Sequence, residues 1–137
     1  MLKCFVILFP DVLSKCVCGA SLVTVPRSSA AVIGNRVELK CSSNSDKQVV
    51  WAFTPTNIST DTELYFGDDI SLPFRSRYTI NNSVRGQHNL IINSVDLELA
   101  GKYSCVEFAT DNKAISYLTV LGMYIMYAHT KLIYIIE

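Results

Sequence analysis

This 137-residue chain has few histidines and no excess of positive or negative charge. It has two histidines, and its 12 basic and 12 acidic residues give a formal net charge of zero. Balanced charge argues against the basic footprint of a nucleic-acid-binding protein, so we expect no nucleic-acid partner. The chain also lacks the Gly-x-Ser-x-Gly, His-Glu-x-x-His and phosphate-binding glycine motifs of common enzymes. We therefore expect no catalytic residue, no metal and no cofactor.

No hydrophobic run is long enough to cross a bilayer as a helix, although half of the residues are hydrophobic. These residues gather at the two ends. Residues 1–20 contain an early lysine, an apolar run over 4–9 and small residues before a possible cut after Ala20. This pattern resembles a secretory signal peptide. The alternative is a buried N-terminal strand or helix of a cytosolic protein.

The cysteine count is odd, at five. Cys4, Cys16 and Cys18 all precede the proposed cut, so cleavage would leave Cys41 and Cys105. An even number of cysteines suits an oxidising compartment. Cys16 and Cys18 are separated by one residue and have no second cysteine or histidine pair nearby, so they do not predict a metal site.

The second apolar end is the tail over residues 122–137. It is too short to span a bilayer as a helix, and His129 and Lys131 interrupt it. It also lacks the polar alternation that would mark an obvious strand. One interpretation is a tail attracted to membranes. The other is genetic: residues 122–124 can be encoded with a splice-donor sequence, which gives the hypothesis that the tail is a truncation or gene-model artefact produced by reading into an intron.

Between the ends, residues 21–121 read as a single all-β domain. Short segments alternate apolar and polar residues and are separated by turn residues, as is typical of a β-sandwich. The segment carries nine basic and ten acidic residues, so it is nearly neutral. The expected strands cover 36–41, 49–51, 77–81, 88–93, 103–105 and 115–121.

Four spaced motifs then stand out: Val37-x-Leu39-x-Cys41, Trp51, Leu90-x-Ile92 and Gly101-x-Tyr103-x-Cys105. Together they resemble a domain of the immunoglobulin superfamily over about residues 22–121. About 38 residues separate Trp51 from Leu90, which leaves room for two further strands. The resemblance therefore implies a variable-type (V-set) two-sheet Greek-key sandwich.

The resemblance implies a structural role for each core residue. Cys41 and Cys105 would form a disulfide between the strands that the family letters B and F. Trp51 and Leu90 would pack in the core around it, and the Tyr103 hydroxyl would bond the backbone near residue 99. These roles predict the fold and not the function.

Two departures from the family pattern have consequences. The usual aspartate four residues before the tyrosine is Leu99, so its usual partner, Arg77, is expected to turn to Glu98 or Asp96 or to stay solvated. The glycine-rich bulge of antigen-receptor G strands is also missing, since residues 113–117 read Lys-Ala-Ile-Ser-Tyr. That absence argues against an antibody or T-cell receptor chain.

Several polar residues have possible roles at the surface. Asn57-Ile58-Ser59 and Asn81-Asn82-Ser83 are sequons, and both fall where the fold predicts exposure, so we expect glycosylation of Asn57 and Asn81. His88 is predicted to be a solvated edge residue. The pair Asp68-Asp69 is too small for an oxygen cage and is predicted to be a solvated turn.

Strand alternation predicts a binding face on the G-F-C-C′ sheet. If Trp51, Cys105 and Leu118 point inward, their neighbours point outward. The predicted face contains Val50, Ala52, Tyr65, Ser104, Val106, Phe108, Ile115 and Tyr117, with Phe66 as the alternative to Tyr65. Exposed apolar and aromatic residues mark contact surfaces, so we expect a protein ligand or a homophilic partner. A missing neighbouring domain could cover this face instead, and a register error of one residue would exchange the two faces.

The sequence thus predicts a non-enzymatic extracellular domain for recognition or adhesion. We expect it to be the outer module of a cell-surface receptor, whose membrane anchor is absent from this chain. The alternative is a complete secreted immune-type binding protein or soluble decoy. The loops over 42–48, 67–71 and 109–113 are short and polar, so no small-molecule substrate is expected.

Overall fold

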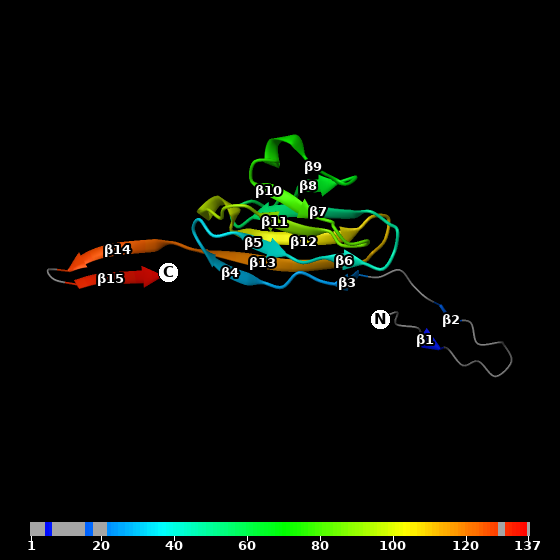
Figure 1. Ribbon diagram of the computed structural model, residues 1–137, viewed down its shortest axis with the longest axis horizontal. Helices are drawn as coiled ribbons and strands as arrows, with labels where there is room; N and C mark the ends of the chain where they lie inside the picture. The colour runs from blue at the N-terminus through cyan, green and yellow to red at the C-terminus, as the bar shows by residue number, and fades with distance from the viewer. Residues whose placement is uncertain (1–4, 7–15, 18–21, 129–130, 137) are drawn as a thin grey trace.

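The computed structural model describes residues 5–6, 16–17, 22–128 and 131–136, with side chains over 22–122. Residues 22–121 form a β-sandwich (Figure 1). Within the first 20 residues, only strands β1 (Phe5–Val6) and β2 (Cys16–Val17) are described, and they pair with each other. The rest of the proposed signal peptide lies outside the described residues, so its assignment stays a prediction.

One layer of the sandwich is a six-stranded sheet. Its order is β4-β13-β12-β7-β8-β9. The bounds are Ser29–Val32 for β4, Lys113–Leu121 for β13, Gly101–Glu107 for β12, Val49–Pro55 for β7, Thr62–Phe66 for β8 and Asp69–Ile70 for β9. All neighbours are antiparallel except β4, which runs parallel to β13. Strands β13, β12, β7 and β8 are the ones predicted as G, F, C and C′.

The second layer consists of two smaller sheets. One has the order β10-β11-β5, with bounds Tyr78–Asn81, Asn89–Ile92 and Val37–Leu39. The other pairs β3 (Leu22–Thr24) with β6 (Ser42–Ser43). Two short 3-10 helices, η1 (Leu72–Phe74) and η2 (Leu97–Leu99), are the only helices of the described ranges. In those ranges no helix is long and apolar enough to cross a membrane.

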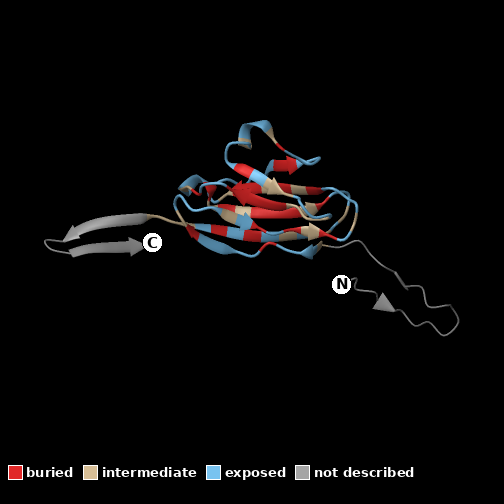
Figure 2. Cartoon of the chain, in the orientation of Figure 1, coloured by how far each residue is buried: buried red, intermediate tan, exposed pale blue. Residues whose placement is uncertain are grey.

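The core lies between the layers and is centred on the disulfide between Cys41 and Cys105, whose Cα atoms are 6.6 Å apart. This disulfide confirms the predicted pairing. Trp51 is fully buried, lies opposite Cys105 in the β7–β12 register, and donates its indole N–H to the His88 carbonyl at 2.7 Å. Leu90 is also fully buried. Figure 2 shows how the buried residues concentrate in the facing strands, while the loops are exposed.

The turn before β12 is held by Tyr103, which is fully buried. Its hydroxyl donates to the Leu99 carbonyl at 2.9 Å, and its ring stacks on Phe53 with centroids 4.6 Å apart. At Gly101, φ is +153° and an added Cβ would lie 2.3 Å from the Thr54 carbonyl oxygen. Strands β12 and β7 therefore approach here more closely than a side chain allows.

Arg77 pairs with two other acidic residues in place of the aspartate that is missing at position 99. It forms ion pairs with Asp96 and with Glu98, each at 3.3 Å. Two of the outcomes that the sequence left open therefore occur together. These side chains are largely exposed, so we expect the ion pairs to add little to stability.

The tail forms a hairpin, although its sequence lacks the polar alternation of an obvious strand. Strands β14 (Met123–Ala128) and β15 (Lys131–Ile136) pair antiparallel and extend beyond the end of β13 (Figure 1). Tyrosine and isoleucine favour extended backbone, and a second strand supplies hydrogen bonds without any need for polar alternation. Whether residues 122–137 are an intron artefact stays a hypothesis.

Candidate protein-binding face

The outer surface of β13, β12, β7 and β8 carries a continuous group of apolar side chains. The strand register sets Ser104 between Ala52 and Ile115, and Val106 between Val50 and Lys113. Four large side chains in this group are exposed by about half: Phe66 at 39%, Phe108 at 51%, Ile115 at 47% and Tyr117 at 57%. We call these four, with Val50, Ala52, Ser104 and Val106, the apolar face.

An aromatic pair marks the loop end of the apolar face. The rings of Phe66 and Phe108 are in contact, with centroids 5.1 Å apart, although they come from β8 and from the end of β12. Each is followed within two residues by a non-glycine residue with positive φ, Asp68 at 67° and Ala109 at 59°. Such backbone is costly and is often found at functional sites. Here the two turns reverse the chain directly after each ring.

Tyr65 was expected on the apolar face, but the structure does not place it there. It is 1% exposed, and Phe66 lies outward in its place. The reason is a register irregularity between β7 and β8, which sets Tyr65 opposite the buried Trp51. Simple alternation along β8 fails there, because Leu64 and Tyr65 are both buried.

Other predicted members lie on the face but are less accessible than expected. Ser104 is 1% exposed, because a small side chain on the central strand is covered by its cross-strand neighbours. Val50, Ala52 and Val106 are half-buried. A partner would therefore contact mainly the four large exposed side chains, above a floor of smaller residues.

A polar cluster of Lys102, Thr54 and Asp61 lies at the other end of the apolar face. Lys102 pairs with Tyr117 and Thr54 in the strand register, and its ammonium group lies 3.2 Å from the Asp61 carboxylate. The Thr54 hydroxyl also donates to Asp61. This hydrogen bond, followed by the contact with Lys102, lowers the pKa of Asp61. The charges are thus paired at the edge, as in the polar rim of a protein interface.

Glu107 is a fully buried carboxylate that is not among the predicted site residues. One carboxylate oxygen accepts from the Ser45 hydroxyl at 2.6 Å, and the other accepts from the Asn112 amide at 3.2 Å. The next residue, Phe108, donates its backbone N–H to the Gln48 carbonyl at 2.8 Å. Glu107 therefore joins the loops that flank Phe108. The alternation of side chains along β12 indicates that Glu107 points inward, since it lies two residues after the inward Cys105.

We expect Glu107→Ala to lower the free energy of unfolding by about 2–3 kcal/mol, because the half-buried Ser45 hydroxyl and Asn112 amide lose their acceptor. Backbone exchange in both flanking loops should also accelerate. Chemical denaturation and hydrogen–deuterium exchange would measure the two effects. Glu63→Ala is the matched control, because Glu63 is exposed. Equal stability of the two variants would contradict this role.

His88 is half-buried, so the prediction of a solvated edge residue is wrong. Its Nδ1 atom lies 3.0 Å from the Tyr65 hydroxyl, which also donates to the Asp68 carboxylate at 3.1 Å. Burial lowers the pKa of His88, and the Asp68 charge opposes this only in part. Burial raises the pKa of Tyr65, so its hydroxyl keeps its proton. The network links the buried end of β8 to the β8–β9 turn.

A pH dependence of stability follows from His88. With a depressed pKa in the folded state, the unfolded chain binds the proton more readily, so stability is complete above the ordinary value of 6.5. It should fall as the pH drops below that value toward the folded-state pKa. Urea denaturation at neutral and mildly acidic pH would measure the fall, and His88→Gln should reduce it. An equal fall in wild type and His88→Gln would assign the dependence to other groups.

The remaining polar candidates are surface residues. Asp69 forms an ion pair with Arg75, and both aspartates of the 68–69 turn are exposed. The described residues contain no group of three or more histidine, cysteine or acidic side chains placed to hold a metal ion. Asn57 is exposed in the turn after β7, and Asn81 is half-buried at the end of β10.

Comparison with known proteins identifies the class of this sandwich. The family model of the immunoglobulin domain matches residues 27–116, so the chain belongs to the immunoglobulin domain family. Domains of this family are in general extracellular, non-enzymatic modules that recognise or adhere to other proteins. No curated protein matches the chain at a significant level.

Proposed function

We propose that this chain is an extracellular recognition or adhesion domain that binds a protein partner through its apolar face. The observation that carries the proposal is the group of four exposed large side chains, Phe66, Phe108, Ile115 and Tyr117, on one continuous sheet. Aromatic residues are enriched at the centres of protein interfaces and supply most of their binding energy. The near-neutral domain is suited to contact by shape and apolar burial more than to long-range steering.

The setting of this function is also a proposal. Residues 1–20 would act as a secretory signal, which would leave one cysteine pair, and glycans would occupy Asn57 and Asn81. The domain would be of the variable type and would form the outer module of a cell-surface receptor. The support is the disulfide itself, because disulfides persist in oxidising compartments.

A binding screen against extracellular domains, including the chain itself, tests the proposal. The chain should be secreted from animal cells and used as produced. We expect a partner whose binding slows hydrogen–deuterium exchange in β7, β12 and β13 and leaves β5, β10 and β11 unchanged. A partner that protects the second layer instead would contradict the assignment of the face.

A further inference from the structure

The sequon at Asn81 has a defined orientation. The side-chain oxygen of Asn81 accepts from the Ser83 backbone N–H at 3.3 Å and from the Ser83 hydroxyl at 2.9 Å. The amide nitrogen, which is the atom that carries an N-linked glycan, is directed the other way. It lies 3.4 Å from the Glu38 carboxylate. A glycan on Asn81 would therefore start toward β5.

Glu38 is held in position for this contact by a buried neighbour. Asn89 lies opposite Asn81 in the β10–β11 register and is 4% exposed. Its amide donates to the same Glu38 oxygen at 2.8 Å, while its side-chain oxygen accepts from the Cys41 backbone N–H at 3.1 Å. The Asn89 hydrogen bond is also the main reason why the pKa of Glu38 is lowered. The Glu38 carboxylate, which lies next to the glycan acceptor Asn81, is thus held in place by the buried Asn89.

Beyond Glu38, the outer edge of β5 is open. Among the described strands, β5 pairs with β11 alone, because β3 pairs with β6 and the chain then crosses to form β4 beside β13. The backbone N–H of His88 donates to the Cys41 carbonyl, so the backbone of Cys41 faces β11. By the alternation of a strand, the backbone of Lys40 faces the open edge. Unpaired edges are liable to pair with other chains.

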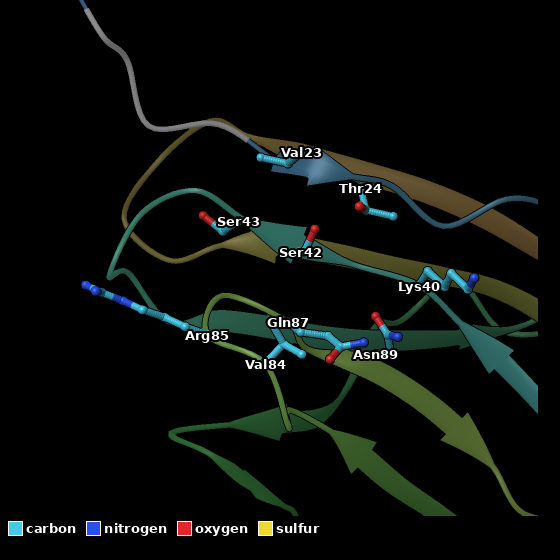
Figure 3. Close-up of a pocket in the computed structure, with 9 residues that line it drawn as sticks. All are labelled: Val23, Thr24, Lys40, Ser42, Ser43, Val84, Arg85, Gln87 and Asn89. Carbon is cyan, nitrogen blue, oxygen red and sulfur yellow. The ribbon is translucent and has the colours of Figure 1, made fainter. Parts of the chain in front are cut away.

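Two adjoining hollows lie along this edge. One has a volume of about 430 Å³ and is lined by Thr24, Val25, Arg27, Ser28, Glu38 and Lys40, among others. The other, of about 400 Å³, shares Thr24 and Lys40 with it and is shown in Figure 3. There Ser42 and Ser43 lie between Val23 on β3 and Val84 in the β10–β11 loop, and Gln87 and Asn89 lie on the side of Val84. The hollows combine hydroxyl and charged groups with exposed valines.

We propose that the chain's own N-linked glycan at Asn81 lies in these hollows and covers the open edge of β5. The inference rests on the secretion and glycosylation in the proposed function. Sugar hydroxyls would meet Thr24, Ser28 and Lys40, and the C–H surfaces of the sugars would pack on Val23 and Val25, which are 52% and 48% exposed. The glycan would thus serve as a built-in cover on the layer opposite the apolar face.

The attachment step uses a lipid-diphosphate oligosaccharide as donor. The bond between C1 of the first sugar and the diphosphate oxygen breaks, and its electron pair leaves with the diphosphate. A bond forms between C1 and the Asn81 amide nitrogen, which loses one proton. The nitrogen keeps its second hydrogen.

A pair of variants at one position tests the proposal in the full chain secreted from animal cells. Ser83→Ala removes the sequon, whereas Ser83→Thr keeps both the sequon and a hydroxyl for Asn81. Mass spectrometry reports occupancy, and hydrogen–deuterium exchange reports protection of residues 23–29 and 37–43. We expect several-fold faster exchange of these segments in Ser83→Ala than in Ser83→Thr, with β12 unchanged. Trimming the wild-type glycan to its first sugar, which leaves every side chain intact, should also accelerate exchange in 23–29.

Two results would overturn the proposal that the Asn81 glycan covers the edge of β5. An occupied Asn81 whose glycan leaves exchange of both segments unchanged would overturn the proposal, as would an unoccupied Asn81. Asn57→Gln serves as a control that removes the other glycan and should not affect these segments. The proposed function is judged separately, because partner binding through the apolar face should be the same in Ser83→Ala and Ser83→Thr.

Discussion

Replacing Cys41 and Cys105 together by alanine is expected to lower the free energy of unfolding by about 4 kcal/mol, the largest effect on stability that we predict. The disulfide joins residues 64 positions apart and connects the two layers of the sandwich. Its loss frees the unfolded chain to sample many more conformations. Both cysteines and Trp51 are fully buried, so the truncated side chains also leave space in the core.

Urea denaturation followed by Trp51 fluorescence would measure this loss, since the chain has a single tryptophan. Ser42→Ala provides a control for substitution near the bridge, because Ser42 is only half-buried. A loss below about 1 kcal/mol in the double variant would mean that packing, rather than the cross-link, holds the layers together.

Introducing charge on the apolar face is expected to have the largest effect on function. The double variant Val106→Glu with Phe108→Asp should weaken partner binding by about 100-fold or more, because it places unpaired charges where apolar side chains are buried on association. The fold should be retained. Phe108 is 51% exposed and Val106 is half-buried on the outer side of β12, so neither fills the core.

The core could be predicted from the sequence because it obeys one rule, the alternation of side chains along a strand. In β12, Tyr103 and Cys105 share the inward parity, and both are fully buried. The same rule extends to Glu107, which was missed because a buried carboxylate becomes reasonable only when its partners from two loops are known.

The outward face was predicted less well, and the errors have physical causes. Strand alternation predicts that Tyr65 points outward, but an irregularity between β7 and β8, which leaves no mark in the sequence, sets it inward opposite Trp51. The contact between His88 and Tyr65 joins residues from different layers, so local patterns carry no information about it. The β14–β15 hairpin has no clear signal in the sequence, because among the described strands β14 and β15 pair with each other alone and their residues do not alternate.

The role of the apolar face as the recognition surface is tested most directly by one ratio of dissociation constants. The constant for the partner, or for self-association, should be measured for Val106→Glu with Phe108→Asp and for the control Val84→Glu with Leu97→Asp. The control also charges two exposed apolar residues, but away from the apolar face. We expect the first variant to bind about 100-fold or more weakly than the control, a difference of about 2.7 kcal/mol. Equal binding by two folded variants would contradict the assignment of the apolar face as the recognition surface.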